Sequence, residues 1–413
     1  CGWAKEVLER HAGLITDRTG RSREQPSGSR QSNTQPSRMN ADRRNPNPVL
    51  DGERGMSRRV KRERQYRDLQ AVYRSSAKRA AEEVLSGNWE NPQTHVEDGT
   101  LFPYWASLFS RDSPWDEREI VNPDRTVWGL LAPITIVEIR ASLKKTKDSA
   151  AGPDGLSLRE VKSIPIRILA KLFNLWLIVG SVPLVFRSSR TTLIPKVPNP
   201  TQPKDYRPIS VSSHMVRCFN KLLAARISEG CSIDASQKAF VPMDGCLEHL
   251  AVLEAVLGEA RSLRGGVYLA FLDMAKAFDS VSHHSIRRAM VRKGVPGALI
   301  EVILSEYNGA TTVLQRGPGK SALTPITRGV KQGDPLSPIL FNLVLDEIIE
   351  GANGATEGVR MSGHKISILA FADDLVLVAQ TSAGLQRLTR KVISGLAENG
   401  LTPNPGKCRT LAV

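Results

Sequence analysis

The pattern of apolar and polar positions from Ile366 to Val378 (ISILAFADDLVLV) predicts a buried β-hairpin with two carboxylates at its tip. Two apolar runs flank the adjacent pair Asp373 and Asp374, and the turn lacks the Gly or Asn that exposed hairpin turns favour. Two like charges side by side in an apolar setting are costly unless a cation compensates them. The hairpin therefore predicts a metal site.

The spacing of apolar residues elsewhere predicts further helices and strands. We expect helices over 135–144, 157–180, 215–228, 245–263, 282–293, 335–350 and 382–399. Pro165 is expected to divide the second of these, and Pro335 to be the first residue of the sixth. Strands are expected over 191–197, 266–273 and 408–413, with a β-ribbon over 312–328. Because strands and helices are interleaved, the core is predicted to be α+β or α/β.

A third carboxylate, Asp273, ends the apolar strand of residues 266–273. If this strand lies beside the hairpin, Asp273 meets Asp373 and Asp374 across adjacent strands. Three acids so placed suit two Mg²⁺ ions roughly 3.5–4 Å apart, the geometry of in-line phosphoryl displacement. One ion would then lower the pKa of an attacking hydroxyl, and the other would neutralise charge on a leaving pyrophosphate.

The N-terminal part of the chain differs in composition from the rest. Residues 21–59 are rich in Arg, Ser, Gln, Asn, Pro and Gly, which predicts a disordered linker, and residues 1–20 are a candidate remnant of a DNA-binding module. Residues 60–134 are expected to form a basic helical extension that binds RNA or DNA, a solvated helix face being the alternative. The residues expected to contact phosphates are Arg58, Arg59, Lys61, Arg62, Arg64 and Arg67.

Overall composition narrows the class of protein. The 413 residues carry a formal net charge of +15, which favours a polyanionic partner such as nucleic acid. The five cysteines form no CxxC pair, which predicts neither a zinc site nor a disulfide framework and favours a reducing compartment. The longest apolar candidate, 172–185, contains Asn174, Gly180 and Pro183, so no membrane span is predicted. Because the chain begins with Cys and stops inside a predicted strand, we expect a fragment of a longer polypeptide.

Several motifs resemble those of reverse transcriptases, most closely the enzymes of non-LTR retrotransposons. The core motifs are F-L-D-M-A-K-A-F-D (271–279), R-G-V-K-Q-G-D-P-L-S-P-I-L-F-N (328–342) and F-A-D-D (371–374), and the flanking ones are L-I-P-K (193–196), D-Y-R-P-I-S (205–210) and N-P-G-K-C (404–408). A-G-P-D-G (151–155) and D-G-C-L-E (244–248) are similar to elements that insert into ribosomal RNA genes. The resemblance covers residues 135–413. It implies an α+β right-hand polymerase fold, with fingers and a small antiparallel palm sheet backed by helices, truncated before the thumb.

The resemblance also implies roles for single residues. Asp273, Asp373 and Asp374 are implied as catalytic metal ligands, and Leu272 and Met274 as backbone contacts to the metal. Lys407 resembles a palm lysine that protonates pyrophosphate, an exposed turn lysine being the alternative. Phe278 is implied to exclude a 2′-hydroxyl, a core Phe being the alternative. The implied nucleotide pocket comprises Lys196, Arg207, Ala275, Lys276, Ala277, Phe278, Gln332 and Gly333, and the implied template contacts are Asp334 and Pro335.

The activity implied by the resemblance is RNA-directed DNA synthesis. It would join dNTPs to a DNA 3′-OH on an RNA template with two Mg²⁺ ions, for which Mn²⁺ can substitute. An endonuclease beyond Val413 would nick the DNA target that primes synthesis, and the site of action would be the nucleus after synthesis in the cytoplasm. Two alternatives stay open: a copy that holds RNA as a maturase does, and a two-metal nuclease. The motifs around Gln332 and Arg207 favour the polymerase.

Overall fold

The computed structural model describes residues 96–112, 118, 120, 125–197, 199–241, 244–262, 266–316, 321–361 and 363–413. The linker, the N-terminal remnant and the basic run Arg58–Arg67 predicted above lie outside the described residues. Val96–Val413 forms one compact unit. None of the helices described in this unit is long and apolar enough to cross a membrane.

The acidic hairpin belongs to a four-stranded sheet with the strand order β10-β3-β9-β8, here called the palm sheet. Its strands are β3 (Tyr268–Leu272), β8 (Ile368–Phe371), β9 (Asp374–Ala379) and β10 (Arg409–Ala412). Every neighbouring pair is antiparallel. The predicted hairpin of β8 and β9 and the predicted small antiparallel sheet are thus confirmed.

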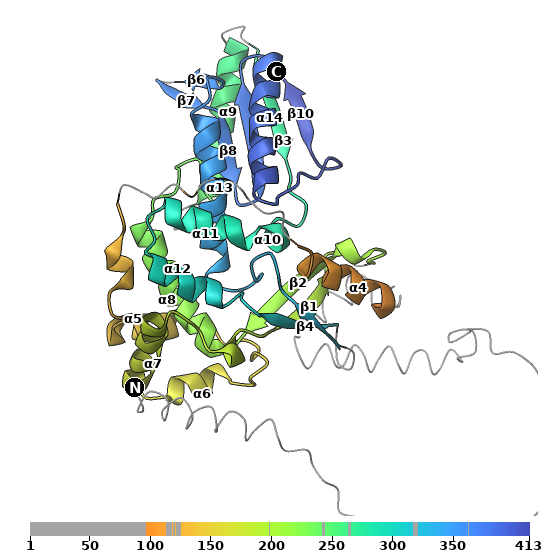
Figure 1. Ribbon diagram of the computed structural model, residues 1–413. Coiled ribbons are helices and arrows are strands. Elements are labelled where there is room, and N and C mark those ends of the chain that lie inside the picture. Colours follow the sequence, from red (N-terminus) through yellow and green to blue (C-terminus); the bar gives the residue numbers. More distant parts are fainter. Residues whose placement is uncertain are drawn as a thin grey trace, which may run out of the picture. The chain divides into compact units, whose positions relative to one another are not determined.

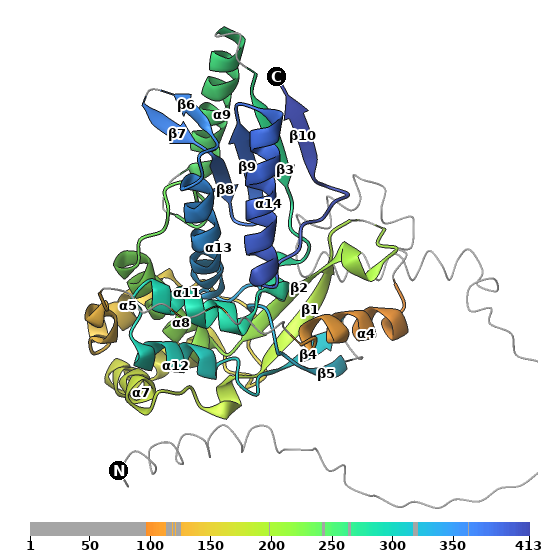
Figure 2. The ribbon, with the colours of Figure 1, turned by 45° about the horizontal axis from the view of Figure 1, so that its top comes forward.

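Helices cover both faces of the palm sheet (Figures 1 and 2). On one face, Val256 and Ala260 of α9 (Gly245–Ser262) pack with Leu269 of β3 and Val378 of β9. Helix α14 (Ser382–Glu398) contacts β9 and β3, and α13 (Ser337–Asn353) contacts β8. A short ribbon of β6 (Val359–Met361) and β7 (His364–Ile366) lies beside α9. The sheet is therefore backed by helices, as predicted.

A second four-stranded sheet has the order β2-β1-β4-β5. Its strands are β1 (Ser189–Pro195), β2 (Tyr206–Ser212), β4 (Thr311–Gln315) and β5 (Ser321–Pro325). Strands β1 and β4 are parallel, whereas the other two pairs are antiparallel. Trp105 and Phe109 of α4 (Asp98–Phe109) pack with Leu193, Tyr206 and Leu314, so α4 is fixed on this sheet by an apolar core.

The remaining helices surround the second sheet and the base of the palm. They are α5 (Ile136–Lys145), α6 (Leu158–Ser163), α7 (Ile166–Val179), α8 (His214–Gly230), α10 (Ala277–Ser280), α11 (His283–Arg292) and α12 (Gly297–Ser305), with the 3₁₀ turns η1 (Trp128–Leu131), η2 (Leu184–Phe186) and η3 (Pro203–Asp205). Pro165 separates α6 from α7, as predicted. The prediction that Pro335 begins a helix was wrong: α13 begins at Ser337, because the preceding turn is closed by a hydrogen bond from the Leu336 N–H to the Asp334 carboxylate. Helix α12 was not predicted.

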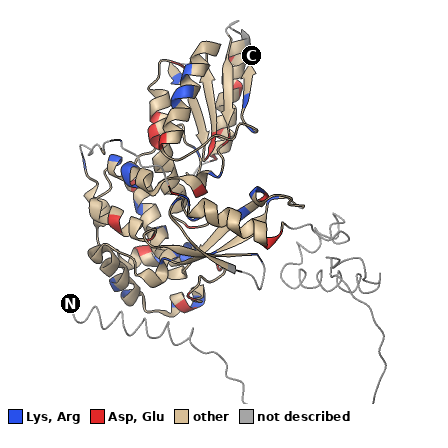
Figure 3. Cartoon of the chain, turned by 45° about the vertical axis from the view of Figure 1, so that its right-hand side comes forward, with Lys and Arg blue, Asp and Glu red and all other residues tan. Residues whose placement is uncertain are grey.

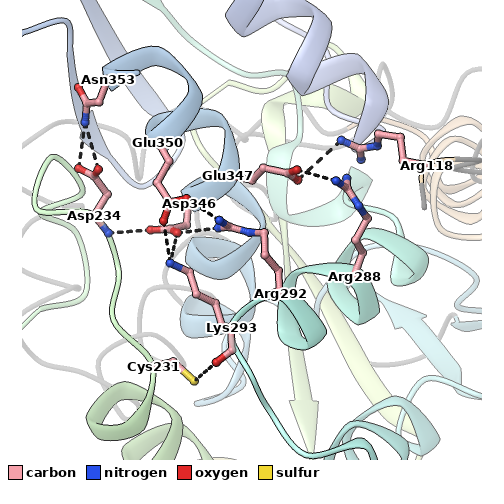
Figure 4. Close-up of polar contacts among 10 residues, drawn as sticks. All are labelled: Arg118, Cys231, Asp234, Arg288, Arg292, Lys293, Asp346, Glu347, Glu350 and Asn353. Atoms are coloured by element: carbon pink, nitrogen blue, oxygen red, sulfur yellow. Dashed lines mark hydrogen bonds and ion pairs between the residues drawn. The ribbon is translucent and has the colours of Figure 1, made fainter. Parts of the chain in front are cut away.

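A buried ion network joins α11 to α13 (Figure 4). The fully buried Asp346 carboxylate pairs with Arg292 and Lys293, and it accepts a hydrogen bond from the Asp234 N–H at 2.6 Å. Glu350, one turn further along α13, pairs with the same two cations. An ionised carboxylate is costly to bury without such partners, so the network ties α11 to α13. Elsewhere in the described part of the chain, acidic and basic side chains are interspersed over many elements (Figure 3).

Candidate active site

The three predicted carboxylates lie at one edge of the palm sheet. Asp373 lies with Ala372 in the turn between β8 and β9, and Asp374 is the first residue of β9, where it pairs with Phe371. Leu272, the last residue of β3, pairs with Leu375 of β9. Asp273 therefore leaves its strand beside Asp374, and the strand that ends at Asp273 does lie next to the hairpin.

The electrostatics of this edge favour a cation. Burial raises the pKa of the Asp373 carboxyl, and the charges of Asp374 and Asp273 raise it further, against a hydrogen bond from its own backbone. Burial also raises the pKa of Asp374, with Asp273 as the next cause. Each of these carboxylates is thus made less acidic by burial and by its acidic neighbours, which is the condition that a positive charge between them relieves.

Part of that positive charge comes from Lys407. Its Nζ lies 3.0 Å from Oδ1 of Asp273, and Asn404 Nδ2 donates to Oδ2 at 3.2 Å. The Asn404 N–H also donates to the Asp273 carbonyl at 2.7 Å, which ties the loop before β10 to the end of β3. Because the Lys407 side chain is 67% exposed, its ion pair is of the weak surface type and open to exchange.

The donor set matches a hard divalent cation. Carboxylate oxygens are the ligands that Mg²⁺ prefers, and Asp273, Asp373 and Asp374 supply them from neighbouring strand ends. Within the stretches of 96–413 that the structure describes, no three His, Cys, Asp or Glu side chains are placed to hold a metal ion. In this arrangement Asp273 is paired with Lys407, so a divalent ion shared by all three carboxylates would have to take the place of that pair.

The turn after Asp273 uses its backbone groups internally. The Ala275 N–H donates to the Thr402 carbonyl at 2.9 Å, and Met274 forms an isolated β-bridge with Pro403. The N–H of Ala275 is therefore bonded inside the protein, and the nucleotide contact that the resemblance implies for Ala275 stays a prediction. The backbone contacts expected of Leu272 and Ala277 are not tested by these bonds and stay predictions.

Lys276 is held against the wall of the site instead of extending into solvent. It has a left-handed backbone (φ +52°), and its Nζ donates to the carbonyls of Lys204 and Tyr206 at 3.2 and 3.4 Å. The same Nζ lies 4.1 Å from the centre of the Trp105 ring, within cation–π range. Burial, and next the charge of Lys196, lower the pKa of Lys276 to about 7. Trp105 was not among the residues assigned to the site, since its role depends on the docking of α4.

Asp279 connects the turn to the Gln332 motif. It is 2% exposed, and its carboxylate accepts hydrogen bonds from Gln332 Nε2 at 2.9 and 3.0 Å. The Gln332 carbonyl in turn accepts from the Ser210 N–H of β2 at 2.8 Å. Burial raises the pKa of Asp279 to about 7, although Lys276 opposes this change. Asp279 was quoted only as part of a motif, and its carboxylate links that motif to the Gln332 motif, whose backbone in turn bonds to Ser210.

The Phe278 ring packs against two other rings, as its alternative role as a core Phe expects, and its contact with a sugar stays a prediction. Its ring stacks on Phe341 with a centroid distance of 4.5 Å and an interplanar angle of 19°, and it meets Phe240 edge-on at 6.2 Å. The residue is half-buried, so one side of the ring is packed and the remainder is accessible. The packing fixes the orientation of the accessible part.

The Gln332–Pro335 turn places only some of its residues at the surface. Gly333 is exposed and left-handed (φ +101°), and a Cβ there would lie 3.2 Å from the Ser210 carbonyl oxygen, so this position requires glycine. Asp334 is 4% exposed, and its Oδ1 accepts from Asn220 Nδ2 at 2.9 Å. Its burial argues against the template contact expected of Asp334, because the carboxylate already bonds inside the protein. Pro335 is half-buried.

Arg207 and Lys196 lie near the open end of the β1–β2 ribbon. Arg207 is exposed on β2 opposite Ile194, and Lys196 is exposed beyond the end of β1, with its N–H donating to the Asp205 carbonyl at 2.7 Å. Lys196 is close enough to Lys276 to affect its charge. These cations therefore gather on one side of the site, whereas the carboxylates lie on the palm sheet.

Comparison with protein-family models matches residues 194–412 to the family described as "Reverse transcriptase (RNA-dependent DNA polymerase)". The chain belongs to the reverse transcriptase family. The matched residues include all four strands of the palm sheet and the three aspartates. The family membership implied by the motifs is confirmed.

Pol polyproteins of retrotransposable elements are similar to most of this reverse transcriptase chain. It is 35% identical over 361 residues to the "Retrovirus-related Pol polyprotein from type-2 retrotransposable element R2DM" of Drosophila melanogaster. This alignment covers 87% of the chain and 34% of the Drosophila protein. The chain is 42% identical over 284 residues to the corresponding protein from type-1 retrotransposable element R2 of Nasonia vitripennis, covering 69% and 27%. The chain thus spans about a third of the length of these relatives.

Among solved structures, a telomerase aligns with part of this chain. The apo telomerase of Candida tropicalis, truncated from its C-terminal domain, aligns with 60% of this chain and 56% of its own. The sequence identity is 16% and the TM-score is 0.40.

The buried Asp279 gives this reverse transcriptase a testable pH dependence of stability. Because folding raises the pKa of Asp279 from 3.8 to about 7, its protonated form stabilises the fold, and this contribution is lost as the pH rises from about 4 through about 7. The slope from one such group is at most about 1.4 kcal/mol per pH unit. The variant Asp279→Asn does not titrate at this position and still accepts from Gln332. Between pH 5 and 7, we therefore expect the unfolding free energy of the wild type to fall by about 2 kcal/mol more than that of the variant.

Urea unfolding of both proteins at several pH values measures this difference. Glu301→Gln, at an exposed carboxylate, serves as the control and should follow the wild-type pH dependence. Parallel curves for Asp279→Asn and the wild type would contradict the assignment.

Proposed function

We propose that this chain is the polymerising part of a non-LTR retrotransposon protein, which adds dNMPs to a DNA 3′-OH on an RNA template. The observation that carries the proposal is the gathering of Asp273, Asp373 and Asp374 at adjacent ends of β3, β8 and β9. The family match over residues 194–412 and the similarity to Pol polyproteins of R2 elements support it.

The three aspartates would hold two Mg²⁺ ions, or Mn²⁺ in their place, with backbone contacts from Leu272 and Met274. Bound divalent ions supply Lewis-acid chemistry, activating a hydroxyl nucleophile and stabilising negative charge on a leaving pyrophosphate. The chain itself positions the carboxylates: β3 and the hairpin are hydrogen-bonded neighbours, so the three side chains share one edge of the sheet. Lys407 holds Asp273 at 3.0 Å, a partner that bound ions would replace.

Basic residues opposite the carboxylates would bind the triphosphate. Arg207 and Lys196 are exposed cations at the open end of the β1–β2 ribbon, and Lys276 lies between them and the palm. Fixed positive charges of this kind stabilise developing phosphate charge. Lys407, released from Asp273, is suited to give a proton to the leaving pyrophosphate.

Phe278, Gln332 and Gly333 would form the nucleotide pocket. Gly333 permits a close approach of the backbone, since a side chain there would strain the turn. Gln332 is oriented by Asp279, which fixes its amide from behind. The accessible part of the Phe278 ring, held by Phe341, would exclude a 2′-hydroxyl and so select dNTPs.

The partners in this proposal are an RNA template, a DNA target that serves as primer, and dNTPs. The basic residues between Arg58 and Arg67 would contact nucleic acid phosphates, and an endonuclease in the same polypeptide would nick the target. Its site of action would be the nucleus. The similarity to Pol polyproteins of retrotransposable elements supports nucleic acids as partners.

Primer extension on an RNA template tests the proposed reaction. In the natural polypeptide that carries this chain, we expect Asp373→Ala to reduce Mg²⁺-dependent dNTP incorporation by at least about 100-fold, because it removes one carboxylate of the metal site. Glu301→Ala, at an exposed carboxylate of α12, is the matched control and should retain full activity. Undiminished extension by Asp373→Ala would refute the proposal.

Substitution of Phe278 tests the proposed sugar discrimination. Phe278→Val shortens the side chain next to the sugar, so the ratio of kcat/KM for dNTPs to that for rNTPs should fall by about 10- to 100-fold. Single-nucleotide incorporation with each substrate measures the ratio. Phe240→Val, which removes the neighbouring exposed ring, should leave the ratio nearly unchanged. An unaltered ratio in Phe278→Val would assign Phe278 to packing alone.

A further inference from the structure

A short segment before α9 extends the palm sheet beside β8. Gln237 forms an isolated parallel bridge with Ala370 of β8. The Lys238 N–H donates to the Ala370 carbonyl at 2.9 Å, and the Ala370 N–H donates to the Ser236 carbonyl at 2.8 Å. Nε2 of His249, on α9, lies 3.0 Å from the same Ala370 oxygen. The segment is thus fixed along the strand that leads into the catalytic turn.

The side chain of Gln237 reaches past β8 to the turn itself. It is 2% exposed, and its Oε1 accepts hydrogen bonds from the N–H groups of Ala372 and Ala239 at 2.9 and 3.0 Å. Its Nε2 points to the Ala372 carbonyl at 3.4 Å. Both polar backbone groups of Ala372 are therefore bound by one buried amide.

Ala372 needs such support because of its conformation. Its φ is +53°, in the left-handed region that side chains other than glycine seldom adopt. Conformations of this kind persist only when the surrounding structure holds them. Ala372 directly precedes Asp373 and Asp374, so its backbone sets the direction in which both carboxylates leave the hairpin.

We propose that Gln237 is a positioning residue for polymerisation: its amide holds Ala372 in the left-handed conformation and thereby places Asp373 and Asp374. The expected effect of Gln237 on catalysis rests on the proposed function, whereas its effect on the conformation of the hairpin does not. Gln237 has no route to the nucleotide itself, since it is buried behind the turn. Gln237 therefore affects the rate of polymerisation only through the positions of Asp373 and Asp374.

Replacement of Gln237 by the similarly sized Leu separates this role from substrate binding. In the natural polypeptide, Gln237→Leu should lower kcat for primer extension by about 10-fold or more, because small displacements of reacting groups are costly. KM for dNTPs should change less than about twofold, since uniform binding is unaffected. Gln386→Leu, at an exposed glutamine of α14, is the control and should leave both constants unchanged.

A second substitution tests the link through Ala372. Glycine adopts the left-handed conformation readily, so Ala372→Gly should reduce the need for the Gln237 amide. We expect Gln237→Leu to lower kcat by less than about threefold in the Ala372→Gly background, a non-additivity that marks direct coupling. The same fold loss in both backgrounds, or an unchanged kcat in Gln237→Leu, would overturn the proposal.

Hydrogen–deuterium exchange of the hairpin gives a readout that does not depend on activity. Gln237→Leu should speed exchange in peptides covering residues 368–376 and leave those of α7 unchanged. If the wild type extends no primer yet this difference is seen, the proposed function fails and the structural role of Gln237 stands; equal exchange would refute that role. If Gln237→Leu does not fold, Gln237→Glu keeps the acceptor oxygen, and it should preserve slow exchange where Gln237→Ala does not.

Discussion

The mutual repulsion of three neighbouring carboxylates, half-buried at Asp273 and Asp373 and exposed at Asp374, is the constraint on which the palm depends. The antiparallel pairing of β3 with β9 brings Asp273 beside Asp374, and the tight turn adds Asp373. Burial and these neighbours raise the pKa of Asp373 and Asp374, so the site is unfavourable without a nearby positive charge. Lys407 provides one such charge through a surface ion pair with Asp273.

Segments that are distant in the sequence hold this edge in place. The Trp105 ring on α4 lies against Lys276, and the buried Asp279 binds Gln332, so two motifs share one hydrogen-bonded wall. On the side of β8 that faces away from β9, Gln237 binds the backbone of the turn at Ala372. Each of these contacts binds backbone groups or a neighbouring side chain. The exposed surfaces of the site therefore stay available for substrate.

Sequence periodicity predicted the hairpin and the strand that ends at Asp273, because these are short apolar runs that end at carboxylates, and the resemblance implied the antiparallel palm sheet. The motifs predicted the family for the same stretch. Contacts that depend on docking between distant elements were not predictable. The cation–π contact of Trp105 requires α4 to pack on the second sheet, and no local pattern shows that Asp334 turns inward to Asn220. Nor does the apolar pattern reveal a parallel bridge at Gln237, since the segment carries no strand-like run.

Direct titration with Mn²⁺ in the absence of nucleic acid tests the central claim that these carboxylates form a divalent metal site. Electron paramagnetic resonance measures the free ion in mixtures with the wild type, Asp373→Asn and Lys407→Met. We predict that Asp373→Asn weakens binding by about 10-fold or more, and that Lys407→Met strengthens it because Asp273 loses its competing partner. Equal affinity of all three proteins for Mn²⁺ would contradict the claim.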